Sequence, residues 1–262
     1  MNINNSLDFL EEVPFLLIEP NKIYNQDCVE GLKLLSDSSV DCIIIDPPYG
    51  INYFSGHYKN KNPHKAIAND NVLFIPIEEL WRILKPTGCM FIFYSQKKPL
   101  IDDRVKNVIV WVKNNWTAGD LEGDFGNQYE LIAYMPKDNF KLHSKRYSNV
   151  WNFNRISANN LLHPTQKPES IIRRLIETAT NEGDIVLDCF MGSGTTAVSC
   201  KQMGRKFIGF ELEKSYCDVA NRRLSQGTLL DITKLEVKSG CDANDDGIPP
   251  NNKLLGILPN EL

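Results

Sequence analysis

Short apolar segments alternate with amphipathic segments along the chain. Segments rich in β-branched or aromatic residues, which are typical of strands, lie at residues 40–45, 89–94, 108–112, 131–135, 184–187 and 207–210. Between several of them apolar residues recur at helical spacing, in 77–84 before Pro86 and in 171–179 before Gly183. This alternation predicts an α/β fold with a doubly wound, mostly parallel sheet that helices cover on both faces.

The length and polarity of the chain predict one domain followed by a tail. A chain of 262 residues is long enough for one α/β domain with a substantial core. We assign residues 1–238 to this domain, and residues 239–262, where the chain turns polar, to a C-terminal tail. The longest apolar runs, such as 15–18 and 42–45, are too short to cross a bilayer, and we expect a cytoplasmic protein without a membrane partner.

The cysteines indicate buried thiols. Their number is odd, none is paired in a CxxC spacing, and several lie in the predicted strands. Reduced core thiols therefore fit better than disulfides or zinc ligands, and we expect no metal site. The residues are Cys28, Cys42, Cys89, Cys189, Cys200, Cys217 and Cys241.

Positive charge is concentrated in two stretches, although the net charge of the chain is −4. Residues 137–168 carry several lysines and arginines against the single acid Asp138, with aromatic residues between them, and residues 55–67 add lysines without any acid. Cations mixed with aromatics suit phosphate contact and base stacking, whereas the structural alternative is a solvated face. The aromatic residues are Phe140, Tyr147, Trp151 and Phe153.

The four residues Asp46-Pro47-Pro48-Tyr49 follow the apolar run 42–45. The acid leaves a buried strand, the prolines fix φ and remove backbone donors, and an aromatic ring comes next. A carboxylate, a carbonyl and a ring face presented together could hold a flat amine. The structural alternative for Tyr49 is a core tyrosine.

A second motif predicts a nucleotide-binding corner. Residues 185–197 read as a strand, a turn with Gly192 and Gly194, and the start of a helix. Glu211 ends the next predicted strand, where an acid can accept both hydroxyls of a ribose. Because Gly192-x-Gly194-x-x-Ala197 also satisfies the loose dinucleotide fingerprint, NAD remains an alternative, as does a glycine turn that only packs helix on strand.

Three motifs in a fixed order carry a family resemblance. Asp46-Pro-Pro-Tyr49, then His163-Pro-Thr-Gln-Lys-Pro168, then Asp188-Cys-Phe-Met-Gly-Ser-Gly-Thr-Thr196 resemble the β group of amino-methylating DNA methyltransferases, over about residues 20–225. The resemblance implies a seven-stranded sheet of the S-adenosylmethionine-dependent type and S-adenosylmethionine as cofactor. Relatives with an Asn-Pro-Pro-Tyr variant usually place the cofactor motif first, whereas here it comes last.

Carried over residue by residue, the resemblance implies a cofactor site with Glu211 on the ribose, Asp27 and Cys28 at the adenine, and Thr165 and Lys167 at the methionine part. Asp27 could instead cap a helix, and Cys28 could be core. His163 fits a positional role better than that of a base. The implied cofactor set is Asp27, Cys28, Asp46, Thr165, Lys167, Asp188, Phe190, Gly192, Ser193, Gly194, Thr195, Thr196 and Glu211.

The same resemblance implies a catalytic set of Asp46, Pro47, Pro48 and Tyr49. The Asp46 carboxylate and the Pro47 carbonyl would accept the two hydrogens of the target amine, and Tyr49 would stack on a base flipped out of the duplex. Adenine N6 is the first choice of acceptor and cytosine N4 the second, because cytosine-modifying relatives more often resemble Ser-Pro-Pro-Tyr. Residues 50–71 would form a mobile loop at the mouth of the site.

Recognition of double-stranded DNA is assigned to residues 137–162, a small recognition insert, with help from 55–67 and 114–127. A short target site read by a homodimer is expected, and a cognate restriction endonuclease is a further partner to test. A catalytically idle nucleic-acid binder is the alternative from another class. The predicted DNA contacts are Lys59, Lys61, Lys141, Lys145, Arg146 and Arg155.

Overall fold

A computed structural model describes residues 18–49, 75–116, 123, 125–157, 161 and 166–238, with the backbone alone for 227–238. The predictions made for the loop 50–71, the tail 239–262, Lys59, Lys61, His163 and Thr165 lie outside these residues. The chain divides into two compact units after Gly227, and the fold that follows is that of the first unit.

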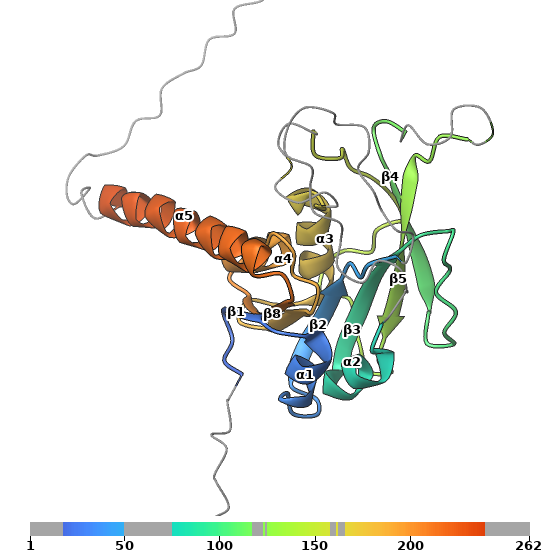
Figure 1. The fold of residues 1–262 in the computed structure, drawn as a ribbon, viewed down its shortest axis with the longest axis horizontal. Helices are drawn as coiled ribbons and strands as arrows, with labels where there is room; N and C mark the ends of the chain where they lie inside the picture. The colour runs from blue at the N-terminus through green and yellow to red at the C-terminus, as the bar shows by residue number, and fades with distance from the viewer. Residues whose placement is uncertain are drawn as a thin grey trace, which may run out of the picture. The chain divides into compact units, whose positions relative to one another are not determined.

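Eight strands form one mixed sheet (Figure 1). Its order is β1-β8-β7-β2-β3-β5-β4-β6, and every neighbouring pair is parallel except β3 with β5 and β4 with β5. The prediction of a mostly parallel α/β sheet is confirmed, with one strand more than the seven expected. The strands are β1 (Lys22–Asn25), β2 (Val40–Ile45), β3 (Leu84–Tyr94), β4 (Asn107–Val112), β5 (Tyr129–Pro136), β6 (Val150–Asn152), β7 (Ile185–Asp188) and β8 (Lys206–Glu211).

The hydrophobic periodicity of 77–84 and 171–179 predicted two of the five helices, α2 and α3. They are α1 (Cys28–Lys33), α2 (Ile77–Ile83), α3 (Glu169–Ala179), α4 (Thr195–Gln202) and α5 (Lys214–Lys238). Helix α2 ends before Leu84, which pairs with Val40 in the sheet, and Pro86 could not have continued the helix. Strands β1 and β6 have no sequence signal, since they are too short and too exposed to show alternation.

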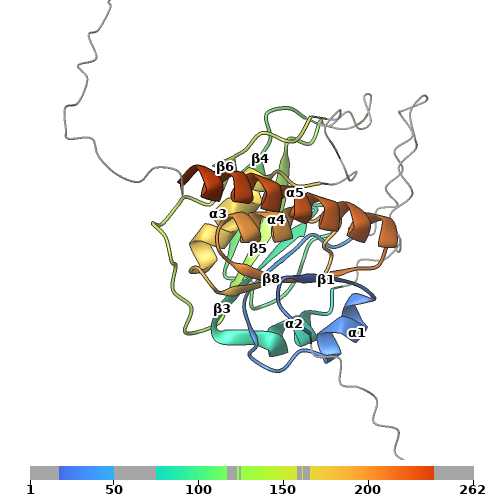
Figure 2. The same cartoon turned by 90° about the vertical axis from the view of Figure 1, so that its left-hand side faces the viewer.

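Different helices pack against the two faces of the sheet: α3 and α4 lie on one side of the strands, and α1 and α2 lie on the other (Figure 2). Along β2, Cys42 and Ile44 belong to the core cluster that includes residues of α3 and α4, whereas Ile43 and Ile45 belong to the cluster with residues of α1 and α2. Side chains alternate between the two faces of a strand, so a strand buried on both faces is apolar throughout. The six cysteines within the described residues are free and buried, which confirms the prediction of core thiols.

The topology brings several strand ends to one edge of the sheet. Parallel strands β2, β3, β7 and β8 end there, and antiparallel β5 starts there, because Leu131 pairs with Tyr94. We call this the carboxyl edge. Asp46, Asp188 and Glu211 therefore lie along the edge where open α/β sheets bind their ligands.

Candidate active site

Asp46 is the first residue after β2 and sits at the carboxyl edge. The Asp46 side chain is 22% exposed, and each of its oxygens has a partner. The Tyr49 hydroxyl donates to Oδ1 over 2.8 Å, and the Lys167 ammonium pairs with Oδ2 over 2.7 Å. Tyr49 also packs against the core cluster of α3 and α4, so the motif folds back on its own acid.

Lys167 links Asp46 to a second partly buried acid, Glu130 of β5. Its Nζ lies 3.1 Å from Glu130 Oε2, while Lys113 Nζ pairs with Glu130 Oε1 over 2.6 Å. These alternating charges form what we call the acid–lysine cluster: Asp46, Lys167, Glu130 and Lys113. The Lys167 ammonium also lies 5.1 Å from the centre of the Phe93 ring and 5.5 Å from that of Tyr49.

Burial and neighbouring charge set the ionisation of this cluster. Burial raises the pKa of Asp46, and the Lys167 charge opposes that rise. Burial disfavours the charged form of Glu130 as well, but Lys167 and Lys113 outweigh it and lower the pKa of Glu130. For Lys167 the two carboxylates outweigh burial, so its pKa is raised and it stays charged. The cluster therefore holds the partly buried Asp46 carboxylate against the Lys167 cation.

The turn after β7 forms the second part of the site. Asp188, 6% exposed, accepts from Phe190 N over 3.0 Å and from the Thr196 hydroxyl over 2.6 Å. Glu211 accepts from Gly192 N over 2.7 Å, which ties the end of β8 to this turn. We call residues 189–194 the glycine loop. Strands β2 and β7 are neighbours, so the prediction that Asp46 and Asp188 end adjacent strands is confirmed.

Backbone conformation and packing demand glycine at position 194. Gly194 caps the N-terminus of α4 with φ of 83°, in the left-handed region that favours glycine. A Cβ there would lie 2.6 Å from Ala220 Cβ of α5. The sequence did not suggest Arg223 of α5, which donates to Ser193 O over 2.7 Å and pairs with Glu169 over 2.8 Å. The glycine loop is thus fixed from both sides.

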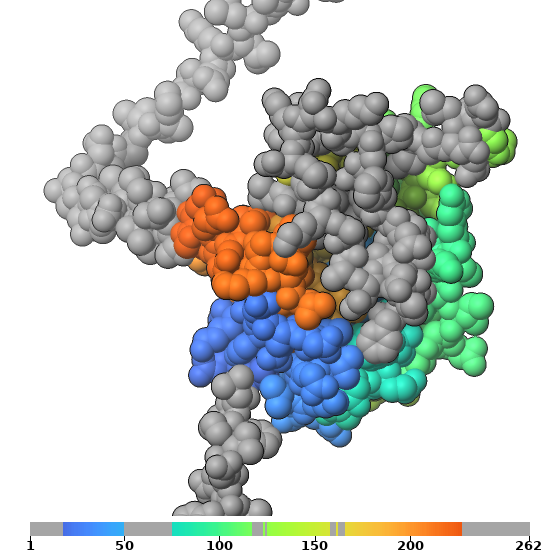
Figure 3. Space-filling view, in the orientation of Figure 1, coloured from blue at the N-terminus to red at the C-terminus, as the bar shows by residue number. Residues whose placement is uncertain are grey.

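Asp27 and Cys28 lie at the start of α1, next to the end of β8. Asp27 Oδ1 accepts from Val29 N over 2.8 Å, so this residue does cap the helix, while its side chain remains exposed. Cys28 is buried in the same core cluster as Cys189. The Asn25 amide donates to Glu211 O and Leu212 O, each over 2.9 Å, which holds the two segments together. In Figure 3 these segments, drawn in blue and orange, are in contact.

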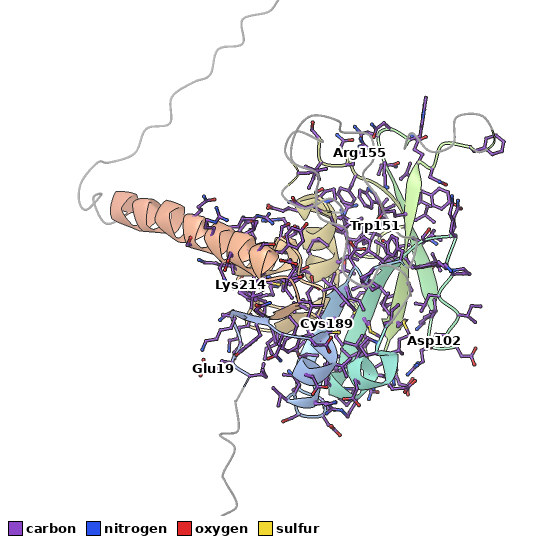
Figure 4. The ribbon with its side chains drawn as sticks, in the orientation of Figure 1. Glu19, Asp102, Trp151, Arg155, Cys189 and Lys214 are labelled. Carbon is purple, nitrogen blue, oxygen red and sulfur yellow. The ribbon has the colours of Figure 1, made fainter. Side chains whose placement is uncertain are left out.

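The predicted DNA-contacting residues separate into two places. Arg155 N donates to the Asn114 side chain beyond the end of β4, so Arg155 lies at the carboxyl edge (Figure 4). Lys141 lies toward the opposite edge, because nearby His143 N donates to Thr178 O near the end of α3. Lys145 and Arg146 are exposed and lie between these places in the chain. The structure therefore places Arg155, and not Lys141, at the same edge of the sheet as the acids.

The aromatic residues of 137–162 do not form the surface for base stacking that the charge pattern suggested. Trp151 is 4% exposed and lies in the core (Figure 4). Phe140 and Phe153 are partly buried and pack against the same core cluster. Arg174 of α3 lies 4.5 Å from the Phe153 ring centre and 4.7 Å from that of Tyr147. That interpretation is wrong for Trp151, since composition does not say which way a side chain points.

The glycine loop and its surroundings fit an adenosine cofactor. The loop glycines carry no side chains, so a ligand can approach their backbone closely. The first N–H groups of α4 have no partner within the helix and can bind it. Glu211 offers a carboxylate beside the loop, and Leu212, 50% exposed, offers an apolar surface next to it. A doubly wound sheet with these features at its carboxyl edge defines a nucleotide-cofactor-binding α/β protein.

Comparison with known proteins identifies the family. The family model for N6/N4 DNA methylases matches residues 40–222. The chain is 33% identical over 250 residues to the DNA adenine methyltransferase YhdJ of Escherichia coli K12, covering 79% of this chain and 83% of that protein. It is 33% identical over 229 residues to the type II methyltransferase M.HpaI of Haemophilus parainfluenzae, covering 76% and 72% respectively. The chain belongs to the N6/N4 DNA methylase family.

Solved structures agree with this family membership. The M1.HpyAVI–SAM complex matches with a TM-score of 0.56 and 31% identity, over 77% of this chain and 98% of that one. The cytosine-N4-specific PvuII DNA methyltransferase shares the fold, with a TM-score of 0.59 at 16% identity, over 77% of this chain and 85% of that one. The resemblance drawn from the three motifs is confirmed, and NAD chemistry is no longer the alternative to it.

No helix among the described residues is both long and apolar enough to span a membrane. Within the same part of the chain, no cluster of three or more His, Cys, Asp or Glu side chains is arranged to hold a metal ion.

Asp188 is expected to make stability depend on pH. Burial raises its pKa from 3.8 to about 7, so the native state carries a penalty for the charged form that is complete above pH 7 and is relieved as the pH falls toward 4. Asp188→Asn removes this penalty and can keep the hydrogen bond from Phe190 N. The gain in unfolding free energy of the variant over wild type should therefore be larger at pH 8 than at pH 5. Each unit by which the folded state raises the pKa of Asp188 corresponds to about 1.4 kcal/mol of this penalty. Denaturant unfolding at both pH values measures this, and an equal difference at the two would contradict it.

Proposed function

We propose that this protein transfers a methyl group from S-adenosylmethionine to the exocyclic N6 of an adenine flipped out of double-stranded DNA, at a specific site. The observation that carries the proposal is the adjacency of β2 and β7, which puts the Asp46 carboxylate beside the glycine loop. The relative named as a DNA adenine methyltransferase supports adenine over cytosine, as does aspartate in first place in the motif. Cytosine N4 remains the second candidate, because the matching family model covers both N6 and N4 methylases.

The residues of this chain would bind and activate the amine. S-adenosylmethionine, when bound, supplies a methyl group on a positively charged sulfur. The amine of adenine is a poor nucleophile because its lone pair is delocalised into the ring. If the Asp46 carboxylate and the Pro47 carbonyl accept its two hydrogens, a pyramidal nitrogen with a free lone pair is favoured. Pro48 fixes the turn, and Tyr49 offers its ring to the base.

The cofactor would lie over the glycine loop. Glu211 is proposed for the ribose hydroxyls, and Asp27 with Cys28 for the adenine; the cap that Asp27 makes uses Oδ1 and is compatible with this role. Phe190, Ser193, Thr195 and Thr196 complete this set with the loop glycines. Thr165 is proposed for the methionine part, whereas the contacts of Lys167 argue for a place beside Asp46.

DNA is proposed to approach the carboxyl edge. Besides Arg155, the connection between β4 and β5 leaves the sheet at this edge and carries two exposed aromatic residues, Trp116 at 67% and Phe125 at 94% exposure. Residues 137–162 remain the proposed recognition insert, which starts after β5 and returns to the edge through β6. The aromatic rings on the β4–β5 connection, in place of Trp151, are then the surface available to bases.

Arg155 and Lys141 provide a matched test of this orientation, since both are exposed cations of the same insert. Arg155→Ala should weaken DNA binding about three- to tenfold and reduce the slope of log affinity against log salt by about one. Lys141→Ala, at the far edge, should leave both values close to those of wild type. Fluorescence titrations with duplex DNA over a range of salt concentrations measure both. A larger loss in Lys141→Ala would reverse the proposed orientation.

The target site and the partners are proposed as follows. A short site read by a homodimer matches the small recognition insert, and sedimentation that gives a strict monomer on and off DNA would contradict the dimer. The type II relative M.HpaI makes a cognate restriction endonuclease the partner to seek beside this protein. Expression in a host without DNA methylation, followed by long-read mapping of modified bases, tests the proposed function: methyladenine at one short sequence supports it, and an unmodified genome opposes it.

A further inference from the structure

The acid that should hold the target amine is already occupied in the structure. Tyr49 takes Asp46 Oδ1, and the Lys167 ammonium lies 2.7 Å from Oδ2. As the amine attacks, it acquires positive charge, so a lysine cation that remains on the same carboxylate would destabilise the transition state. Lys167 nevertheless has to stay nearby, because its charge lowers the pKa of Asp46, and without it the Asp46 carboxyl would hold a proton more readily.

Glu130 offers the Lys167 ammonium a second position. Lys113 holds Glu130 Oε1 over 2.6 Å, which fixes the carboxylate with Oε2 toward Lys167. That Oε2 is buried and lies 3.1 Å from Lys167 Nζ, but among the described residues it receives no well-aligned hydrogen bond. The flexible lysine stem could therefore turn its ammonium from Asp46 toward Glu130. This movement would align the hydrogen bond between Lys167 Nζ and Glu130 Oε2, which are already 3.1 Å apart.

We propose that Glu130 is a positioning residue that takes over the Lys167 ammonium when the target amine reaches Asp46. The proposal rests on the proposed function and deepens it, since it names the group that frees the acceptor. No proton moves in this step: the ammonium exchanges one carboxylate for the other, and Asp46 keeps its charge for the amine. Lys113 serves by orienting Glu130.

Glu130→Gln tests the exchange, because the amide keeps the shape of the side chain and loses its charge. Lys167 would then pair with Asp46 alone, and single-turnover methyl transfer should fall at least about tenfold while cofactor affinity is retained. The acidic limb of the pH–rate profile should move to lower pH. The groups that face Asp46 are Lys167, Tyr49, Glu130 and, at the end of the neighbouring strand β7, Asp188. The negative charge of Glu130 raises the pKa of Asp46 in the wild type. The variant removes only this charge, so the pKa of Asp46 should fall.

A second variant separates positioning from stability. Glu130→Gln leaves Lys113 buried without its acid, which by itself costs unfolding free energy. The double variant Glu130→Gln, Lys113→Gln removes that unpaired charge and should recover stability without recovering methyl transfer. If the double variant recovered methyl transfer together with stability, the proposal would be overturned. The same holds if turnover and pH profile in Glu130→Gln equalled those of the wild type. A wild-type protein that methylates no DNA would instead overturn the proposed function itself, and the two failures are distinguishable in the same assay.

Discussion

Asp46→Ala is expected to reduce methyl transfer to DNA at least about a thousandfold while cofactor binding is retained. The substitution removes the carboxylate proposed to accept the amine hydrogen, but it touches neither the glycine loop nor the bond from Gly192 to Glu211. Lys167 keeps Glu130 as a partner, so the fold should tolerate the change. Single-turnover transfer from labelled cofactor and equilibrium cofactor binding measure the two effects separately.

Asp46→Asn serves as the matched control for shape. It preserves the volume of the side chain and one carbonyl acceptor but has no negative charge, and it should be nearly as inactive as Asp46→Ala. Turnover in either variant close to that of wild type would exclude Asp46 as the acceptor of the target amine.

Gly194→Ala is expected to abolish cofactor binding and to lower stability. Alanine at a φ of 83° costs about 1–2 kcal/mol, and its Cβ would lie 2.6 Å from Ala220 Cβ, which adds about 1–3 kcal/mol or displaces the loop. Because this loop carries the proposed cofactor contacts, a shift should remove binding. Calorimetric titration with S-adenosylmethionine and denaturant unfolding measure the two losses.

Gly183→Ala is the control for this prediction, since Gly183 has nearly the same φ of 84° but nothing within 4 Å of its added Cβ. This variant should show the backbone strain alone and bind the cofactor as wild type does. If Gly194→Ala bound cofactor as well as Gly183→Ala, the close packing of the glycine loop on α5 would not matter for the site.

The fold was predictable where the chain is buried on both faces. Strands β2 and β7 are nearly continuous apolar runs; Asp46 directly follows the first and Asp188 ends the second. Both the sheet and the adjacency of these two acids therefore followed from the sequence. Strands β1 and β6 were missed because these segments are short, and pairing with a neighbour, and not periodicity, makes them extended.

The site was predictable only in part. Motif order located Asp46 and the glycine loop, but it could not tell that Lys167 turns toward Asp46 and Glu130, because that depends on how β5 pairs with β3. The sequence marks these residues only by their positions: Glu130 is a charge at the start of one apolar strand, and Lys113 directly follows another apolar strand. Trp151 was misjudged because charge around an aromatic residue does not reveal whether its ring faces solvent or the core.

Nucleoside analysis tests the central claim most directly. Purified protein is incubated with unmethylated duplex DNA and S-adenosylmethionine labelled in the methyl group, and the DNA is then digested to nucleosides. The wild type should place label in N6-methyladenine, and Asp46→Ala should give none above background. Label found only in N4-methylcytosine would contradict the choice of base, and equal labelling by both proteins would contradict the role of Asp46.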